Sequence, residues 1–358
     1  MLIGIDCRMI GSRFTGIGHY IENLIDNIAK QDKLNDYILY LNDPEYSEIK
    51  LPNSKFKKIL VNSPIYSLKE QLIFPFHIYK SNPDLVHFPH FNAPILYVKK
   101  NIVTIHDVTL NTFAKSLVKK LAYNLSFFIN CIKAKKIICV SNFSKQELNK
   151  QVPFTKNKSE VIYEGCIFND KADPEHKKNA VPHIFYAGNW KAHKNVENLI
   201  LAFEILKSQY KYQGQLKLTG TVSQDHLKPL ELIEKSKYKK DIIQLGKINT
   251  QQLATNFQTA QVYVQPSFVE GFGLPVLEAF HYQTPVACSQ TGSLPEVAGK
   301  AALYFNPHDP AEMAHQINTL LTSPKKAESL VKMGNDRLSL FSFGKMTKET
   351  IKVYQDVL

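Results

Sequence analysis

Short apolar segments alternate with amphipathic stretches along nearly the whole chain, and this pattern limits the folds open to it. Such an alternation is typical of buried parallel strands joined by crossover helices. In the first half the predicted strands are LIGID (2–6), DYILYL (36–41), KKILV (57–61), DLVHF (84–88), IVTIH (102–106), KIICV (136–140) and EVIY (160–163). In the second half they are HIFYAG (183–188), LKLTG (216–220), IIQLG (242–246), VYVQP (262–266), PVACS (285–289) and ALYF (302–305). The sequence therefore predicts the α/β class.

The length of 358 residues exceeds what one hydrophobic core comfortably fills, so two domains are expected. Residues 166–182 are polar, contain two prolines and lack an apolar period, which indicates an interdomain linker. We expect an N-terminal Rossmann-like domain over 1–170 and a C-terminal one over 171–340. The helical pattern of 341–358 predicts a last helix that packs back across the domain junction. Because doubly wound sheets bind ligands beyond the carboxyl ends of their strands, the expected site is a cleft between the domains.

The composition excludes several classes of protein. Hydrophobic residues make up 44% and charged residues 21%, which is ordinary for a globular chain and argues against disorder. The sequence opens on a predicted strand rather than a signal peptide, and no apolar stretch approaches the ~20 residues that span a bilayer. Its five cysteines are scattered without CxxC spacing, which favours reduced thiols over disulfides or zinc. We expect a cytoplasmic protein.

A formal net charge of +12 calls for an anionic partner or surface. Basic residues gather between Lys115 and Lys136 around the apolar centre LAYNLSFFIN, with no acid among them. Two interpretations stay open: a solvated helix face, or peripheral docking at the inner face of an anionic membrane. Nucleic acid is not expected, because no recognised binding motif accompanies the charge.

The segment 266–279, PSFVEGFGLPVLEA, is the most informative one. A strand ends there, a glycine turn follows, and Pro275 suits the first turn of the next helix. The amides of 272–274 would then face an anion or a ring of hydroxyls beside the positive helix end. Glu270 and Glu278 lie up to ~12 Å apart if the segment were all helical, so they would contact different parts of one extended ligand. Taken singly, each glutamate also fits an ordinary helix residue.

The run EGFGLPVLEA closely resembles the E-x7-E signature of glycosyltransferase family 4, whose members have the GT-B fold. The resemblance implies that Glu270 contacts sugar hydroxyls and that Glu278 binds the ribose. It further implies that the intervening amides face the sugar and phosphates. The likeness continues through TPVACSQTGSLPEVAGKAALYFNPHDP (284–310), although Gln283 stands where a glycine is usual.

Departure of a nucleoside diphosphate requires positive charge at the phosphates. The run YAGNWKAHKN (186–195) resembles the family's G-x5-K-N turn, which places Lys194 on the diphosphate after the turn at Gly188. Many relatives carry an arginine soon after that glycine. Here the residues at or near that place are Asn189, Lys191 and His193. Which of them supplies a second cation stays open.

The first domain offers two further elements. In CRMIGSRFTGIGHY (7–20), Gly16 and Gly18 stand between a strand and a helix predicted from about His19, where a plain structural turn is the alternative. The run resembles the T-G-I-G-[RH]-Y opening of mannosyltransferase-like members and implies close backbone approach to the donor phosphates or acceptor. His106 lies in TIHD, similar to the family's T-x-H-D, which places this histidine beside the transferred sugar. Residues that either contact the acceptor or simply pack are His87, His90 and Asn92.

The resemblance implies a retaining, metal-independent glycosyltransferase that needs no cofactor. It would move a hexose, with mannose from GDP-mannose favoured, to a saccharide or lipid-linked saccharide in cell-surface polysaccharide synthesis such as that of lipopolysaccharide. The alternatives are a non-catalytic sugar-nucleotide-binding assembly subunit and a GT-B epimerase or phosphorylase. The candidate catalytic residues are His106, Lys194 and Glu270. The candidate donor-binding residues are Gly16, Gly18, Gly188, Asn189, Lys194, Glu270, Phe272, Gly273, Leu274 and Glu278.

Overall fold

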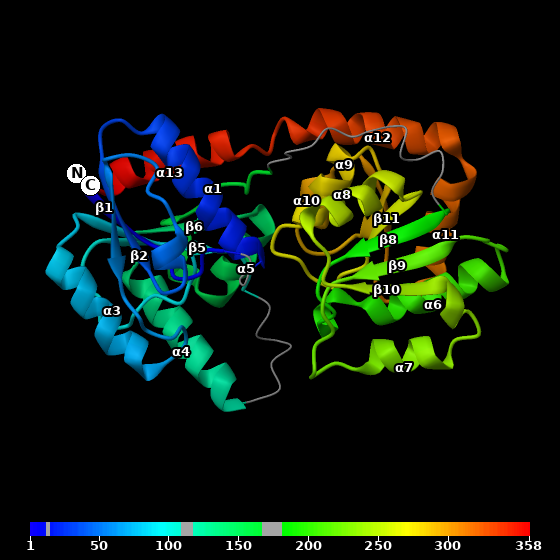
Figure 1. The fold of residues 1–358 in the computed structure, drawn as a ribbon, viewed down its shortest axis with the longest axis horizontal. Coiled ribbons are helices and arrows are strands. Elements are labelled where there is room, and N and C mark those ends of the chain that lie inside the picture. Colours follow the sequence, from blue (N-terminus) through cyan, green and yellow to red (C-terminus); the bar gives the residue numbers. More distant parts are fainter. Residues whose placement is uncertain (12–14, 109–116, 167–180) are drawn as a thin grey trace. The chain divides into compact units, whose positions relative to one another are not determined.

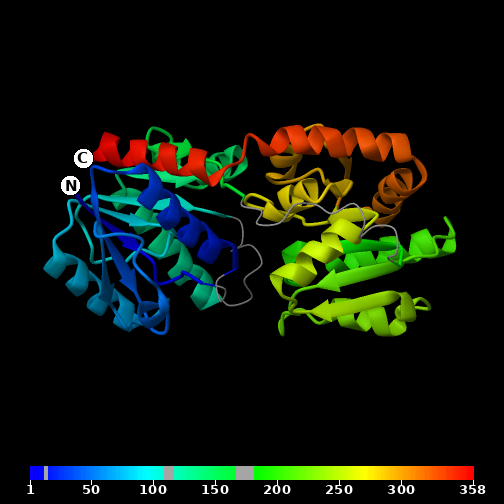
Figure 2. The same cartoon turned by 45° about the horizontal axis from the view of Figure 1, so that its top comes forward.

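The computed structural model describes residues 1–11, 15–108, 117–166 and 181–358. The chain divides into two compact units, one formed by Met1–Gly165 with Phe341–Leu358, the other by Cys166–Leu340. Each unit contains one sheet with helices on both faces (Figures 1 and 2). Lys115 and most of the predicted linker at 166–182 lie outside the described residues.

The N-terminal unit is built on a parallel sheet whose order is β3-β2-β1-β4-β5-β6-β7. Its strands are β1 (Leu2–Asp6), β2 (Asp36–Leu41), β3 (Phe56–Leu60), β4 (Leu85–Phe88), β5 (Asn101–Ile105), β6 (Lys136–Cys139) and β7 (Ser159–Val161). The order of the strands reverses between β1 and β4, which makes their carboxyl ends the switch point where such sheets place ligand-binding loops.

Helices cover both faces of this sheet because successive strand residues point to opposite sides. The helices are α1 (Thr15–Gln31), α2 (Glu45–Glu48), α3 (Leu68–Ser81), α4 (Leu117–Lys133), α5 (Asn142–Gln151) and α13 (Phe343–Val357). Leu39 belongs to the core under α1 and α13, whereas its neighbour Tyr40 belongs to the core under α3 and α4. Figure 1 shows these two pairs of helices on opposite sides of the sheet.

The C-terminal helix α13 packs on the N-terminal unit beside α1. The Tyr354 hydroxyl lies 2.7 Å from Nδ1 of the buried His87. A Cβ atom at Gly165 would lie 2.1 Å from the backbone nitrogen of Phe343, so only glycine fits where the helix begins. The last helix is thus part of the core of the first unit.

The C-terminal unit repeats the design with the order β10-β9-β8-β11-β12-β13. Its strands are β8 (His183–Ala187), β9 (Gln215–Thr219), β10 (Ile242–Gly246), β11 (Val262–Gln265), β12 (Val286–Ser289) and β13 (Ala302–Phe305). Its helices are α6 (Val196–Ser208), α7 (Lys228–Lys235), α8 (Thr250–Thr259), α9 (Leu274–His281), α10 (Leu294–Ala298), α11 (Pro310–Thr322) and α12 (Pro324–Leu338). Its switch point lies between the neighbouring strands β8 and β11.

The strand predictions are confirmed, and the strand ends agree with the predicted ones to within one residue, except at the end of β7. Apolar β-rich runs of this kind leave little ambiguity, because the central strands are buried on both faces. Among the described residues, none of the helices is both long and apolar enough to cross a bilayer.

Candidate active site

An ion pair joins two predicted site residues at the switch point of the C-terminal sheet. After β8 the chain forms a short 3-10 turn, Ala192–Lys194, and after β11 it forms the turn that contains Glu270. Because β8 and β11 are neighbours, the two turns meet. Lys194 Nζ lies 2.8 Å from Oε1 and 2.7 Å from Oε2 of Glu270. The sequence placed both residues at the donor but did not predict that they bind each other.

The Glu270 carboxylate is buried and fully engaged. Its Oε1 atom also accepts hydrogen bonds from Ser267 Oγ at 2.6 Å and from Gln265 Nε2 at 2.7 Å. Burial alone would raise the pKa of Glu270, but the Lys194 charge and the hydrogen bonds from Lys194 and Ser267 outweigh it and hold the pKa below its ordinary value. Glu270 is therefore ionised at neutral pH. Sequence analysis missed Gln265 and Ser267, which look like ordinary strand-end residues.

Glu278, in the middle of α9, has the opposite surroundings. In the described part of the chain its carboxylate has neither a hydrogen-bond donor nor a cationic partner. Burial raises its pKa from an ordinary 4.5 to about 7. A half-buried carboxylate of this kind gains most when a ligand supplies hydroxyl donors.

The turn between these acids ends in an uncapped helix. Gly273 occupies the N-cap position with φ +109°, a conformation open to glycine, and Pro275 follows in the first turn. No side chain caps α9 in the structure described, so its first amides remain oriented for a ligand. Ser293 Oγ donates to the carbonyls of Glu270 at 3.0 Å and Phe272 at 2.6 Å and so fixes the turn. Leu274 begins the helix as predicted.

Three residues were predicted as alternatives for a second positive charge near Lys194, and the structure leaves one of them. Asn189, directly after Gly188, has its Oδ1 atom engaged by the Thr221 hydroxyl at 2.9 Å. Burial, with the Lys194 charge adding to it, lowers the pKa of His193 to about 4, so this histidine is neutral at pH 7. Lys191 is exposed and follows the same turn. Of these three residues, only Lys191 is left as a candidate for a second cation.

The structure corrects the predicted position of Gly16 and Gly18. Helix α1 begins at Thr15, so Gly16 and Gly18 lie in its first turn rather than in a loop before it. A Cβ atom at Gly18 would lie 2.1 Å from the Gly11 carbonyl oxygen, so this glycine is required by packing. Among the described residues, no atom lies within 4 Å of the corresponding position at Gly16.

His106 follows β5, as predicted, and both of its ring nitrogens face acceptors. Nδ1 lies 2.6 Å from Glu164 Oε1, and Nε2 lies 2.9 Å from the Pro89 carbonyl oxygen. The ring is thus held by the protein on both sides. Tyr20 contacts the ring edge-on, with centroids 4.9 Å apart. Sequence analysis missed Glu164, whose only signal was its place just after β7.

All three residues left open between acceptor contact and packing have internal partners, and the Nδ1 atom of His90 accepts from the Asn92 backbone N–H at 3.2 Å. His87 is buried between the hydroxyls of Tyr354 at 2.7 Å and Thr104 at 2.8 Å. Asn92 donates to both carboxylate oxygens of Glu70, at 3.0 and 3.1 Å. For His87 and Asn92 the packing interpretation holds.

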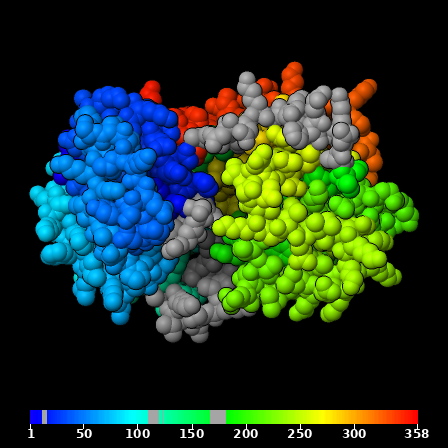
Figure 3. Space-filling view, viewed as in Figure 1, coloured from blue at the N-terminus to red at the C-terminus, as the bar shows by residue number. Residues whose placement is uncertain are grey.

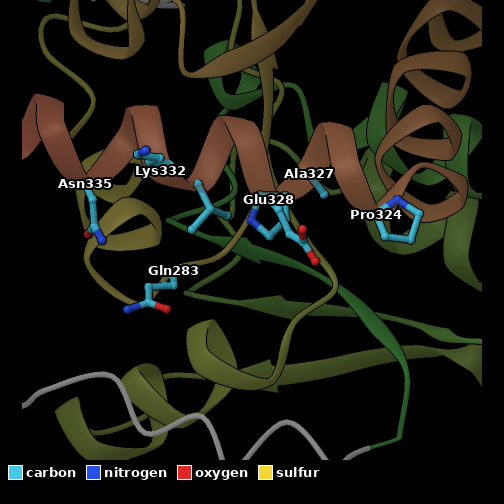
Figure 4. A pocket seen from close by; sticks show the side chains of 8 residues that line it. Gln283, Pro324, Ala327, Glu328, Lys332 and Asn335 are labelled. Carbon is cyan, nitrogen blue, oxygen red and sulfur yellow. The ribbon is translucent and has the colours of Figure 1, made fainter.

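A hollow of about 470 Å³ lies elsewhere in the C-terminal unit, between α12 and the turn after α9 (Figure 4). Gln283, Glu328, Lys332 and Asn335 line it. Gln283 has φ +56°, which explains why a glycine suits this turn in the family that the sequence resembles. None of the predicted site residues lines this hollow, so it is separate from the candidate donor site.

Sequence comparisons match both halves of the chain to glycosyltransferase families. The family model described as Glycosyl transferases group 1 matches residues 168–337, and that described as Glycosyltransferase Family 4 matches residues 14–166. O-antigen chain mannosyltransferase B of Escherichia coli is 27% identical over 286 residues, which cover 76% of this chain and 74% of that protein.

Solved structures share the fold across the whole chain. Sucrose-phosphate synthase from Thermosynechococcus elongatus has a TM-score of 0.82 at 20% identity, covering 99% of this chain and 98% of that one. Anabaena HepE in complex with UDP and glucose has a TM-score of 0.77 at 16% identity, covering 99% and 100%. At such identities these likenesses show the fold alone. Together with the family matches, they identify the chain as a glycosyltransferase of family 4 with the GT-B fold.

Proposed function

We propose that this glycosyltransferase moves a hexose, with mannose favoured, from a nucleoside-diphosphate sugar to a saccharide or lipid-linked saccharide, with retention of configuration. The acceptor would belong to a cell-surface polysaccharide. The likeness to the O-antigen chain mannosyltransferase supports both the sugar and the acceptor class. The UDP and glucose of HepE support a nucleoside-diphosphate donor and leave uridine as a rival to guanosine.

The proposal depends on the different surroundings of the two acids Glu270 and Glu278. The Lys194–Glu270 pair holds an ammonium group in place, and two of its hydrogen bonds go to that carboxylate. An ammonium group has three donors, so one remains for a phosphate oxygen. The uncapped amides of α9 add positive potential, and Glu278 provides an acceptor for ribose hydroxyls. These features suit a diphosphate flanked by two sets of hydroxyls.

Retention by front-face substitution agrees with how Glu270 is held. A carboxylate that accepts bonds from Lys194, Ser267 and Gln265 is a poor nucleophile, because those bonds would have to weaken before it attacked a sugar carbon. We propose that the leaving phosphate assists deprotonation of the acceptor hydroxyl. In that route the protein supplies positioning and charge stabilisation, without a metal ion.

His106 enters this proposal as a hydrogen-bonding or polarising group, not as a base. Its Nδ1 atom faces Glu164 and its Nε2 atom faces the Pro89 carbonyl, so both ring nitrogens are already occupied by the protein.

The test is a panel of sugar nucleotides, including GDP-mannose and UDP-glucose, with transfer and slow donor hydrolysis followed by mass spectrometry. We expect one donor to be turned over, with activity that persists in a chelator. Lys194→Ala and Glu270→Ala should each lower kcat at least about a hundredfold, as loss of a charge-stabilising donor does elsewhere.

Three results would overturn parts of the proposal. Binding of donors without transfer or hydrolysis would favour the non-catalytic subunit. Interconversion of free sugar nucleotides would favour an epimerase. Strict dependence on Mg²⁺ would contradict the metal-independent route.

A further inference from the structure

Helix α3 presents a stripe of apolar side chains on the side turned away from the core. Leu68, Leu72 and Phe76 are 87%, 67% and 63% exposed. Their spacing of four residues aligns them along one side of the helix. Phe74 and Ile78 point the other way and are fully buried. The helix is therefore apolar on two sides, and only one of them is covered.

Helix α4 repeats this arrangement on the same face of the sheet. Its exposed apolar residues, spaced by three and four, are Leu121, Leu125, Phe128 and Ile132. Phe127 and Cys131 on its other side belong to the core that also contains Phe74 and Ile78 of α3. Both helices lie on one side of the N-terminal unit (Figures 1 and 2).

The segment 94–98 connects the two stripes. Lys133 of α4 donates through Nζ to three of its carbonyl oxygens, at 2.8, 2.8 and 2.9 Å. The Tyr79 hydroxyl of α3 donates to the Leu96 carbonyl at 3.1 Å. The side chains of Leu96 and Val98 are exposed. We call the exposed apolar residues of α3, α4 and 94–98 the α3–α4 face; residues coloured as α3 form part of the outer surface in Figure 3.

Charge around the α3–α4 face has one sign. Lys69 and Lys80 are exposed on α3, and its only acid, Glu70, is buried 2.7 Å from Arg8. No acidic residue occurs in the sequence between positions 107 and 147, which include all of α4. A solvated helix face would carry polar side chains where these helices carry leucine and phenylalanine.

We propose that the α3–α4 face docks on an anionic bilayer surface. Leucine and phenylalanine side chains would enter the headgroup boundary, while the flanking lysines keep their ammonium groups beside lipid phosphates. The inference rests on the proposed function for its purpose, since a lipid-linked acceptor is reached at a membrane. The charge complementarity favours lipid over a second copy of this basic chain, whose like charges would repel.

The test is flotation of the intact protein with vesicles of phosphatidylcholine alone and of phosphatidylcholine mixed with phosphatidylglycerol. We expect binding to the anionic vesicles, weakened at high salt. Leu72→Gln/Phe76→Gln and Leu125→Gln/Phe128→Gln should each lower the partition coefficient at least about tenfold, because each removes two apolar groups from the boundary. Lys69→Glu/Lys80→Glu should lower binding to anionic vesicles by a similar factor.

The matched control is Leu34→Gln, because Leu34 is 78% exposed in the turn after α1, outside the α3–α4 face. It should bind vesicles like the wild type. Donor hydrolysis is measured in parallel without lipid, so loss of docking is told apart from loss of the proposed chemistry. Equal binding by wild type and stripe variants, or no preference for anionic lipid, would overturn the proposal. So would a dimer that the stripe variants dissociate while vesicles stay unbound.

Discussion

The two glutamates at either end of the segment 270–278 have opposite environments. Glu270 accepts hydrogen bonds from three side chains and pairs with Lys194, and its pKa lies below the ordinary value. Glu278 has no such partner within the described residues, and burial raises its pKa to about 7. Both side chains belong to one turn and one short helix, so their difference comes from tertiary neighbours.

The two environments suit two different roles in a donor site. A carboxylate bound as Glu270 is bound holds a cation in place before any ligand arrives, so no reorganisation is required when charge develops on the phosphate. A carboxylate without donors, such as Glu278, gains hydrogen bonds only when a ligand brings them. In the proposed function, Glu270 would hold the cation before the donor binds, and Glu278 would gain hydrogen bonds when it does.

The largest expected effect comes from breaking the ion pair. Lys194→Met should lower the free energy of unfolding by about 3–5 kcal/mol at neutral pH, since it leaves the buried Glu270 carboxylate without its cation. Because the folded pKa of Glu270 is depressed, the stabilisation that it provides exists above the unfolded pKa and is lost as pH falls through the folded one. The penalty should therefore shrink in acid. Urea denaturation across pH measures it.

The double variant Lys194→Met/Glu270→Gln sharpens this result. With both charges gone it should recover much of the stability of the single variant and none of the activity. A Lys194→Met protein as stable as the wild type would show that the pair does not hold the turn.

Glu278→Gln should raise the free energy of unfolding, whereas Lys194→Met should lower it. The folded pKa of Glu278 is raised, so its burial costs stability progressively between about pH 4.5 and about pH 7, up to roughly 3 kcal/mol above that range. The variant should be more stable than the wild type at pH 8 and no different near pH 4. Thermal unfolding at both pH values checks this. Glu328→Gln, an exposed change on α12, is the control and should shift neither.

Ser267→Ala tests how Glu270 is held without removing a charge. The hydroxyl donates to the carboxylate at 2.6 Å, and loss of such a charged hydrogen bond costs about 2 kcal/mol. Ser289→Ala is the matched control, because this buried hydroxyl bonds to uncharged groups, the Thr291 hydroxyl at 2.7 Å and the Thr291 backbone N–H at 3.3 Å, and its loss should cost about 1 kcal/mol. Equal costs would mean that the Ser267 bond gains nothing from the charge.

The sequence predicted the strands well because the central ones are apolar runs buried on both faces. The family resemblance also predicted Lys194 and Glu270, which the structure brings together, and Glu278, whose place at the donor stays a prediction. Sequence analysis failed at helix α1, whose start was expected near His19, because glycines at 16 and 18 are poor helix formers, and only the tertiary contact with Gly11 requires the one at 18.

Contacts between distant residues were beyond the reach of spacing. Glu164 lies 58 positions from His106, and Lys194 lies 76 positions from Glu270. Only the sheet order, which makes β8 and β11 neighbours, brings the latter pair together. Spacing along the sequence also does not reveal that Glu278 lacks a partner among the described residues, because this depends on the tertiary fold.

The smallest expected effect concerns ligand binding at Glu278. If ribose hydroxyls donate to its carboxylate, a bound donor favours the ionised form, so affinity should rise with pH until the carboxylate is fully ionised above about pH 7. Titration calorimetry at about pH 6 and about pH 8 should then show roughly a tenfold gain in affinity for the wild type and none for Glu278→Gln. An intact sugar nucleotide is the right probe, since its diphosphate is esterified at both ends and does not titrate in this range, whereas the terminal phosphate of a free nucleoside diphosphate does. If the affinity of the wild type changed with pH no more than that of the variant, the ribose would not contact Glu278. The contrast between the two acids would then have no role in donor binding.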